Sequence, residues 1–259
     1  MQLLKLGGSV ITVKDEPMTA DHGNIRRLCE EIKATWPTPL ILVHGGGSFG
    51  HPVAERYGIA DGFKSERQVV GFSRTHQAMV ALNTIVVDTL LDLGVPALSV
   101  TPSSIITTRE GRIETAGFDV LGRLVVKGIL PVLYGDSVID RTRGFSILSG
   151  DQLVVRLAID MGASRIVFGV DVDGVYTSNP KVVPEARLIE RLSLDKLEGY
   201  VEIGRSLTTD VTGGMLGKVM EASEAVRAGV EVLLVNATRR DAILKGLTGE
   251  PVTGTVLTR

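Results

Sequence analysis

Glycine pairs or triplets occur at three places in the chain where an apolar run ends or a helical pattern begins: Gly7-Gly8, residues 45–50 and Gly213-Gly214. Glycine has no Cβ, so its backbone N–H group can approach a ligand closely. Where such a turn leads into a helix, the free N–H groups and the helix dipole both favour an anion. One such stretch could be a tight structural turn, but three in one chain predict a site for phosphate groups.

Two lysines lie beside these turns. Lys5 stands in an apolar run directly before the first glycine pair, and Lys218 follows the third. A lysine buried in a strand needs a partner, whereas one on an edge strand could reach solvent. Acidic groups stand at expected strand ends or helix starts: Asp136, Asp151 and Asp171. Glycine turns, lysines and a carboxylate are suited to phosphoryl transfer, which depends on positioning and on neutralising negative charge, often with magnesium.

Strands and helices must alternate to bring these groups together. Apolar runs predict strands at residues 3–6, 40–43, 97–100, 129–134, 165–170, 230–235 and 255–257, and hairpins at 105–113 and 138–147. Helical spacing predicts helices at 21–35, about 52–56, 65–93, 118–127, 152–161, 216–228 and 239–247, with a polar, helix-like connection at 195–204. This order is typical of a mostly parallel sheet covered on both faces, with ligands at the carboxyl ends of its strands.

The composition excludes several classes of protein. The 259 residues are 44% hydrophobic and 22% charged, which suits a globular protein with a sizeable core. A net charge of −2 without a Lys/Arg cluster argues against nucleic-acid binding. The single cysteine, Cys29, excludes an internal disulfide, and no apolar run reaches membrane length. The chain opens on an expected strand, without room for a signal peptide, so we expect a cytoplasmic protein.

Other ligand motifs fit poorly. Residues 45–50 match G-x-G-x-x-G, but a dinucleotide site also needs an acidic residue about 20 positions further on, closing a second strand, and residues 63–67 supply none. The chain has no P-loop motif. Asp171 and Asp173 lack the later ligands of a calcium loop, and the four histidines lack zinc spacing. We therefore assign no metal ligand.

The surviving motifs resemble those of the amino acid kinase superfamily in order and spacing, over nearly the whole chain. They are Lys5-Leu-Gly-Gly-Ser9, His44-Gly-Gly-Gly47, Gly150-Asp151, Asp171-Val-Asp-Gly-Val-Tyr176 and Thr212-Gly-Gly-Met-x-x-Lys218. Gly47-Ser-Phe-Gly-His51-Pro and Lys14 resemble the branch that phosphorylates isopentenyl phosphate, of archaeal type. The resemblance implies one α/β domain over residues 1–259, a three-layer αβα sandwich with a central, mostly parallel sheet. Residues 1 to about 150 would bind the phosphate acceptor, and residues 151–259 would bind ATP.

The resemblance also implies ATP and Mg²⁺ as cofactors, a homodimer, and roles for individual residues. Lys5 and Lys218 would hold the transferring phosphoryl group and the ATP phosphates, Asp151 would orient both lysines, and Lys14 would steady the transition state. The implied ATP-binding residues are Lys5, Leu6, Gly7, Gly8, Ser9, Gly46, Asp171, Tyr176, Gly214 and Lys218. The implied residues for the substrate phosphate are Gly45, Gly50, His51 and Gly150.

His51 and the long apolar helix carry the substrate assignment. A histidine at an anion-binding turn can donate to phosphate and be held protonated by it, although it could instead cap the helix. The helix expected at 65–93 is unusually apolar, which fits burial, a subunit contact or a pocket for an isopentenyl tail. The candidates to line such a pocket are Phe72, Met79, Ile139 and Ile147.

Two alternatives remain open. Other members of the superfamily phosphorylate acetylglutamate, carbamate, UMP or fosfomycin, and Arg74 is the nearest candidate to bind an amino-acid carboxylate. The fold could also serve a non-catalytic nucleotide sensor, because fold does not fix function. Loss of Lys5, Lys218 or Asp151 would favour the sensor, but all three are present.

Overall fold

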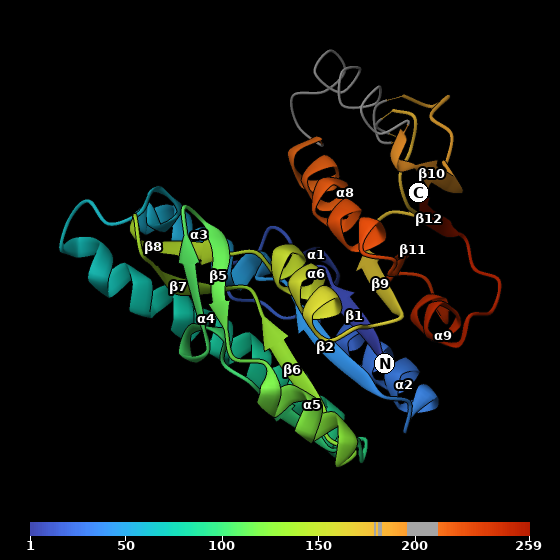
Figure 1. The fold of residues 1–259 in the computed structure, drawn as a ribbon, viewed down its shortest axis with the longest axis horizontal. Coiled ribbons are helices and arrows are strands. Elements are labelled where there is room, and N and C mark those ends of the chain that lie inside the picture. Colours follow the sequence, from blue (N-terminus) through green and yellow to red (C-terminus); the bar gives the residue numbers. More distant parts are fainter. Residues whose placement is uncertain (179, 181–182, 196–211) are drawn as a thin grey trace.

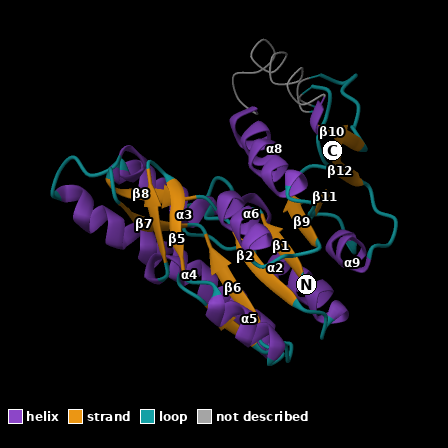
Figure 2. Ribbon diagram, viewed as in Figure 1, coloured by secondary structure: helices purple, strands orange, loops and turns teal. Residues whose placement is uncertain are grey.

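An eight-stranded sheet runs through the centre of the protein (Figures 1 and 2). The computed structural model describes residues 1–178, 180, 183–195 and 212–259. The strand order is β10 (Arg191–Ser193), β12 (Gly254–Thr258), β11 (Glu231–Asn236), β9 (Arg165–Val170), β1 (Gln2–Leu6), β2 (Leu40–His44), β6 (Leu130–Tyr134) and β3 (Ala97–Ser99). Neighbouring strands are parallel except β11 and β12. The expected mostly parallel sheet is confirmed.

Helices cover both faces of this sheet. One face packs against α1 (Gly8–Ile11), α2 (His22–Thr35), α3 (Gly47–Tyr57), α4 (Arg67–Asp92) and α9 (Ala242–Thr248). The other packs against α5 (Asp119–Val126), α6 (Gly150–Asp160) and α8 (Thr212–Arg227). Alternate residues of a strand face opposite sides, so Leu4 and Leu6 join the first core and Leu3 the second. Lys5 lies on the same side as Leu3, toward α6 and α8, and the three-layer αβα architecture is confirmed.

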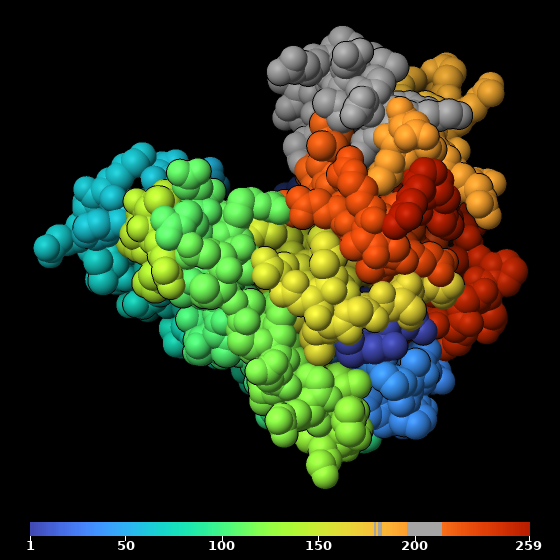
Figure 3. Space-filling view, viewed as in Figure 1, coloured from blue at the N-terminus to red at the C-terminus, as the bar shows by residue number. Residues whose placement is uncertain are grey.

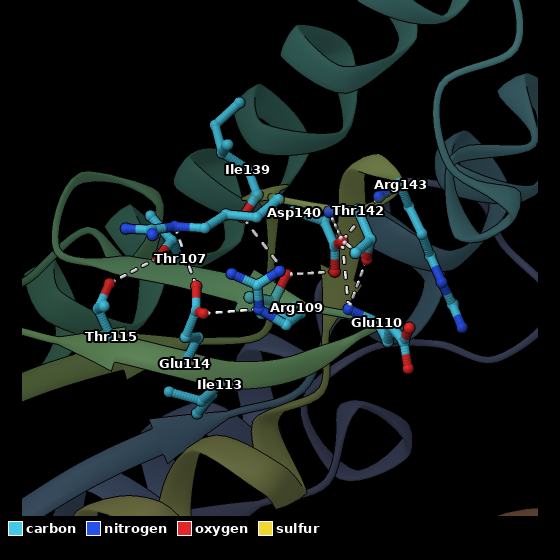
Figure 4. Close-up of polar contacts among 12 residues, drawn as sticks. Thr107, Arg109, Glu110, Ile113, Glu114, Thr115, Ile139, Asp140, Thr142 and Arg143 are labelled. Carbon is cyan, nitrogen blue, oxygen red and sulfur yellow. Dashed lines mark hydrogen bonds and ion pairs between the residues drawn. The ribbon is translucent and has the colours of Figure 1, made fainter.

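The two predicted hairpins form a separate four-stranded sheet, in the order β5 (Arg112–Ala116), β4 (Ile106–Arg109), β7 (Asp136–Asp140) and β8 (Gly144–Leu148). Asp140 joins their turns, because it accepts hydrogen bonds from Thr108 Oγ1, Gly111 N and Arg143 N. Figure 4 shows Asp140 with Thr142 and Arg143 of the second turn. Burial alone would raise the pKa of Asp140, but these donors hold it well below its ordinary value. Two short 3-10 helices complete the described elements, at Ile59–Asp61 and Pro102–Ser104.

Three helices begin earlier than their sequence patterns predict, α6 by two residues and two others by more. The helix expected near Pro52 starts at Gly47, and the helix expected at Leu216 starts at Thr212. Lys218 therefore lies in the second helical turn rather than the first. The glycines predicted as loop are helical because tertiary contacts override weak helix propensity; for example, the Ser48 N–H donates to Thr12 Oγ1. Strand β10 was not predicted, and apart from Asp195 the connection expected at 195–204 lies outside the described residues.

Candidate active site

The carboxyl ends of β1, β2, β6 and β9 open onto one cavity. These parallel strands run the same way, so the residues that follow them meet at one edge of the sheet. The cavity measures about 830 Å³ and is lined by residues of all three glycine stretches. Figure 3 shows the surface indented between the part coloured cyan to green, which includes the second sheet, and α8, coloured orange. This volume lies within the range of about 300–1,000 Å³ that is typical of small-molecule sites.

A carboxylate held between two ammonium groups lies in this cavity. Lys5 Nζ lies 2.6 Å from Asp151 Oδ1, and Lys218 Nζ donates to Asp151 Oδ2 at 2.6 Å. Lys5 projects from β1, which lies between β2 and β9, so the edge-strand alternative for this lysine is wrong. Elements far apart in the sequence therefore bring the three predicted charged residues together.

Burial and neighbouring charge shift the pKa values of this group. Burial would raise the pKa of Asp151, but Lys5 and Lys218 outweigh it and lower the pKa to about 2. Burial, followed by the charge of Lys5, lowers the pKa of Lys218 to about 8, although Asp151 opposes the shift. The cluster carries two cations for one anion, and the excess positive charge faces the cavity.

The first two glycine turns touch each other. A Cβ on Gly8 would lie 2.2 Å from Gly47 N, and one on Gly45 would lie 2.8 Å from Gly8 N. Side chains at Gly8 and Gly45 would therefore force the turns apart. The N-terminal ends of α1 and α3 thus meet over one cavity, as expected for a site that holds two phosphate groups side by side.

His51 is the fifth residue of α3, whose N-cap is Gly46. The helix-capping alternative for His51 is therefore wrong. Its side chain is exposed to the cavity, yet the surrounding protein desolvates it. This desolvation, followed by the charge of Lys5, lowers the pKa of His51 below its usual value. At neutral pH the imidazole of His51 is therefore uncharged, and one of its ring nitrogens can donate a hydrogen bond.

Most of the predicted site residues line this cavity. They are Lys5, Gly7, Gly8, Ser9, Lys14, Gly45, Gly46, Gly50, His51, Met79, Ile147, Gly150, Asp151, Asp171, Tyr176, Gly214 and Lys218. Leu6, Phe72 and Ile139 do not line it: Leu6 is buried in the core, Phe72 packs on Phe145, and Ile139 is 52% exposed. Arg74, the candidate for an amino-acid carboxylate, is exposed and also lies outside the lining.

Asp173 orders the loop that follows β9. Its carboxylate accepts from Tyr176 Oη at 3.2 Å, Asn236 Nδ2 at 2.9 Å and an Arg239 guanidinium nitrogen at 2.6 Å. Burial would raise the pKa of Asp173, but these donors lower it. Asp171 and Tyr176, on either side of Asp173 in the sequence, line the cavity, whereas Asp173 does not. Asp173 therefore fixes the conformation of the loop through these hydrogen bonds without lining the cavity.

Sequence reasoning missed the pair formed by His76 and Asp136. His76 Nδ1 lies 3.0 Å from Asp136 Oδ2, and this contact raises the pKa of His76. Asp136 also accepts from the backbone N–H groups of Ser103 and Ser137. Asp136 was singled out as an acidic group at a strand end, but no local pattern points to a partner 60 residues away. His44, by contrast, is fully buried in the core, where burial lowers its pKa to about 4.

Fold and site together define a class of protein. The model of the amino acid kinase family matches residues 1–236, and the chain belongs to this family. Within the family, the chain is similar to proteins named isopentenyl phosphate kinase. The relative from Methanothermobacter thermautotrophicus is 43% identical, and the alignment covers 100% of this chain and 99% of that protein.

Solved structures agree with this relationship. One described as an isopentenyl phosphate kinase superposes with a TM-score of 0.88 at 39% identity, covering 100% of both chains. A substrate complex of an isopentenyl phosphate kinase gives a TM-score of 0.81 at 30% identity, covering 99% of both chains. UMP kinase from Ureaplasma parvum, at 17% identity and a TM-score of 0.68, shares the fold.

The described residues offer neither a cluster of metal ligands nor a membrane-spanning helix. Residues 1–178, 180, 183–195 and 212–259 contain no group of three or more His, Cys, Asp or Glu side chains placed to hold a metal ion. Within the same residues, no helix combines the length and apolar character that crossing a membrane requires.

Proposed function

We propose that this protein transfers the γ-phosphoryl group of ATP to isopentenyl phosphate, giving isopentenyl diphosphate and ADP. An oxygen of the substrate phosphate bonds to the γ-phosphorus, and the bond from that phosphorus to the β–γ bridging oxygen breaks. The product belongs to isoprenoid biosynthesis, here by an alternative, archaeal-type mevalonate route. The observation that carries the proposal is that His51 lines the same cavity as the apolar residues Met79 and Ile147.

ATP is the phosphoryl donor of a kinase family, and the lysine cluster suits it. Lys5 and Lys218 provide two ammonium groups against the single carboxylate of Asp151. Phosphoryl transfer develops negative charge on the transferring group and on the departing ADP oxygen. Preorganised cations stabilise that charge without reorganising during the reaction. We assign Lys5 and Lys218 to the ATP phosphates and the transferring group, and Asp151 to holding both ammonium groups in place.

Backbone N–H groups would hold the rest of ATP. Gly7, Gly8 and Ser9 stand at the start of α1, and Gly46 and Gly214 line the same cavity. We assign all five to the ATP site; Leu6, of the same motif, is buried in the core and is not assigned to it. Asp171 and Tyr176, on the loop that Asp173 orders, would lie near the nucleoside.

The acceptor would lie against α3 and the start of α6. We assign its phosphate to Gly45, Gly50, His51 and Gly150, and the steadying of the transition state to Lys14. The isopentenyl tail has no polar group and needs an apolar surface. Met79 and Ile147 are the two of the four apolar candidates that line the cavity, so we assign the tail to them.

Mg²⁺ fits this site as part of the ATP complex rather than as an ion held by the protein. The described residues contain no cluster of three potential metal ligands. Mg²⁺ usually keeps several water molecules and takes other ligands from substrate phosphates. When bound, it would supply further neutralisation of the phosphate oxygens.

We also propose a cytoplasmic homodimer, and the use of ATP supports the cytoplasmic location. Helix α4 exposes apolar side chains that a subunit contact could cover, since Val69 is 52% and Val70 56% exposed. Light scattering at micromolar concentration is expected to give twice the mass of the 27.7 kDa chain. A monomer at that concentration would contradict this prediction.

Replacing His51 tests the assignment of the acceptor. A His51→Ala variant lacks the side-chain hydrogen bond to the substrate phosphate, so we expect kcat/KM for isopentenyl phosphate to fall about tenfold or more. Affinity for ATP should change little, because the His51 side chain is not among the groups assigned to ATP. His51→Asn retains a donor and should recover part of the loss. Steady-state kinetics with each substrate varied in turn measures these constants.

Protonation gives a second readout of the same contact. His51 begins with a lowered pKa, and an adjacent phosphate dianion raises it, so binding should take up more protons in the wild type than in His51→Asn. Calorimetric titration of isopentenyl phosphate in buffers of different ionisation enthalpy measures the difference. Wild-type kinetics in His51→Ala together with a lower melting temperature would mean that His51 is structural, and the acceptor assignment would fail.

A further inference from the structure

Thr12 joins the two touching glycine turns through a single hydroxyl group. It is the C-cap residue of α1, only 4% exposed, and its side chain lies against the cavity. Thr12 Oγ1 donates to the Gly8 carbonyl at 2.9 Å and accepts from the Ser48 N–H at 3.0 Å. Gly8 is the first residue of α1, and Ser48 lies in the first turn of α3. A hydroxyl suits this place because one oxygen can donate and accept at once.

The contact leaves little room for adjustment. A Cβ on Gly47 would lie 2.1 Å from Thr12 Oγ1, and a Cβ on Gly8 would lie 2.2 Å from Gly47 N. The hydroxyl and the two glycines therefore form one closely packed group. The distance between the two turns depends on the 3.0 Å hydrogen bond, since a carbon in place of the oxygen needs about 3.5 Å or more.

We propose that Thr12 is a positioning residue that sets the distance between the donor phosphate and the acceptor phosphate. The inference rests on the proposed function, because it requires ATP phosphate against the start of α1 and acceptor phosphate against Gly50 and His51 of α3. Phosphoryl transfer needs the reacting atoms about 3–3.5 Å apart and in line. A displacement of about 1 Å can cost a hundredfold in rate, so a residue that touches neither substrate can control turnover.

Three variants test this role. Thr12→Val keeps the shape of the side chain but replaces the oxygen by a methyl group, which breaks both hydrogen bonds and separates the turns. Thr12→Ser keeps the hydroxyl. Thr84→Val is the matched control, because Thr84 Oγ1 also donates to the carbonyl four residues earlier, at 2.9 Å, but on the exposed face of α4. The measurements are kcat at saturating ATP and acceptor, the Kd for ATP, and the melting temperature.

We expect Thr12→Val to lower kcat tenfold or more while the Kd for ATP stays within threefold of wild type. Thr12→Ser and Thr84→Val should keep kcat within threefold. The inference is overturned if Thr12→Val loses less than tenfold, if Thr12→Ser loses as much as Thr12→Val, or if the loss appears only in the Kd for ATP. Should Thr12→Val fail to fold, Thr12→Ala removes the same two hydrogen bonds, so the distance between the turns is no longer fixed, and the same limits apply.

Failure of the proposed function gives a different result. In that case the wild-type protein does not phosphorylate isopentenyl phosphate, whatever stands at position 12. The Thr12 comparison is then made with the acceptor that the wild type does phosphorylate, and the same limits decide it.

Discussion

An Asp151→Asn variant is expected to lose at least about a hundredfold in kcat, by analogy with the loss of preorganised electrostatic groups elsewhere. Asparagine keeps the shape of the side chain but removes the carboxylate charge between Lys5 and Lys218, whose ammonium groups each lie 2.6 Å from an Asp151 oxygen. The two ammonium groups would then repel each other and leave their positions. Removing one member of a buried ion pair is also destabilising by about 3–5 kcal/mol in fully buried cases, so the melting temperature should fall.

The pH profile separates this electrostatic effect from general damage. In the wild type the pKa of Lys218 is about 8, so the alkaline fall of kcat/KM for ATP should lie near that value. Asp151 raises this pKa; its loss lowers the pKa further, and the alkaline fall should move to lower pH in Asp151→Asn. Asp160→Asn, near the end of the same helix and exposed, is the control. Near-normal turnover in Asp151→Asn would contradict the role given to the cluster.

Lys218→Met is expected to lower kcat by a factor on the order of 10² to 10³, the size of effect seen when one preorganised donor to developing charge is removed. Methionine has a similar length and no charge, so it can retain the packing of the side chain over Phe168, whose ring centre lies 5.5 Å from the ammonium nitrogen. Burial disfavours the charged lysine, as its lowered pKa shows, so the melting temperature should change by only a few degrees.

The same substitution at Lys33 provides the control, because Lys33 is exposed in the last turn of α2, far from the cluster in sequence. Stopped-flow or steady-state measurements of ADP release, with melting curves on the same samples, test both variants. If Lys218→Met turned over at the wild-type rate, the ATP phosphates could not lie where we place them.

The sequence predicts the main sheet well because each of its long strands is an unbroken apolar run between turn residues. Lys5 interrupts one of these apolar runs, and a lysine buried in a strand needs a partner of opposite charge. The motif resemblance names Asp151 as that partner, and the structure brings the two together. The charged residues of the site could thus be predicted where they lie within a recognisable motif at the end of a strand or the start of a helix.

The remaining features depend on contacts that have no local pattern. The glycines after β2 and those before Met215 are expected in loops, yet both stretches contribute to helices. After β2, Thr12 accepts a hydrogen bond from the Ser48 N–H in the first turn of α3. His76 and Asp136 are 60 residues apart and meet only after α4 packs beside β7. Phe72 was placed in the pocket from its helical position, but it packs on Phe145 of the second sheet, whose pairing the hairpin patterns did not specify.

The acceptor that the wild-type protein phosphorylates is the most direct measure of its function. Purified protein is supplied with ATP, Mg²⁺ and, in separate reactions, isopentenyl phosphate, N-acetylglutamate, carbamate, UMP or fosfomycin, and phosphorus NMR follows the products. We predict that isopentenyl phosphate has the highest kcat/KM, by about a hundredfold or more, because it alone combines a phosphate for His51 with an apolar tail for Met79 and Ile147. The product should show the coupled signals of a diphosphate. A higher kcat/KM for any of the other acceptors, or no transfer to isopentenyl phosphate at all, would contradict the proposed function.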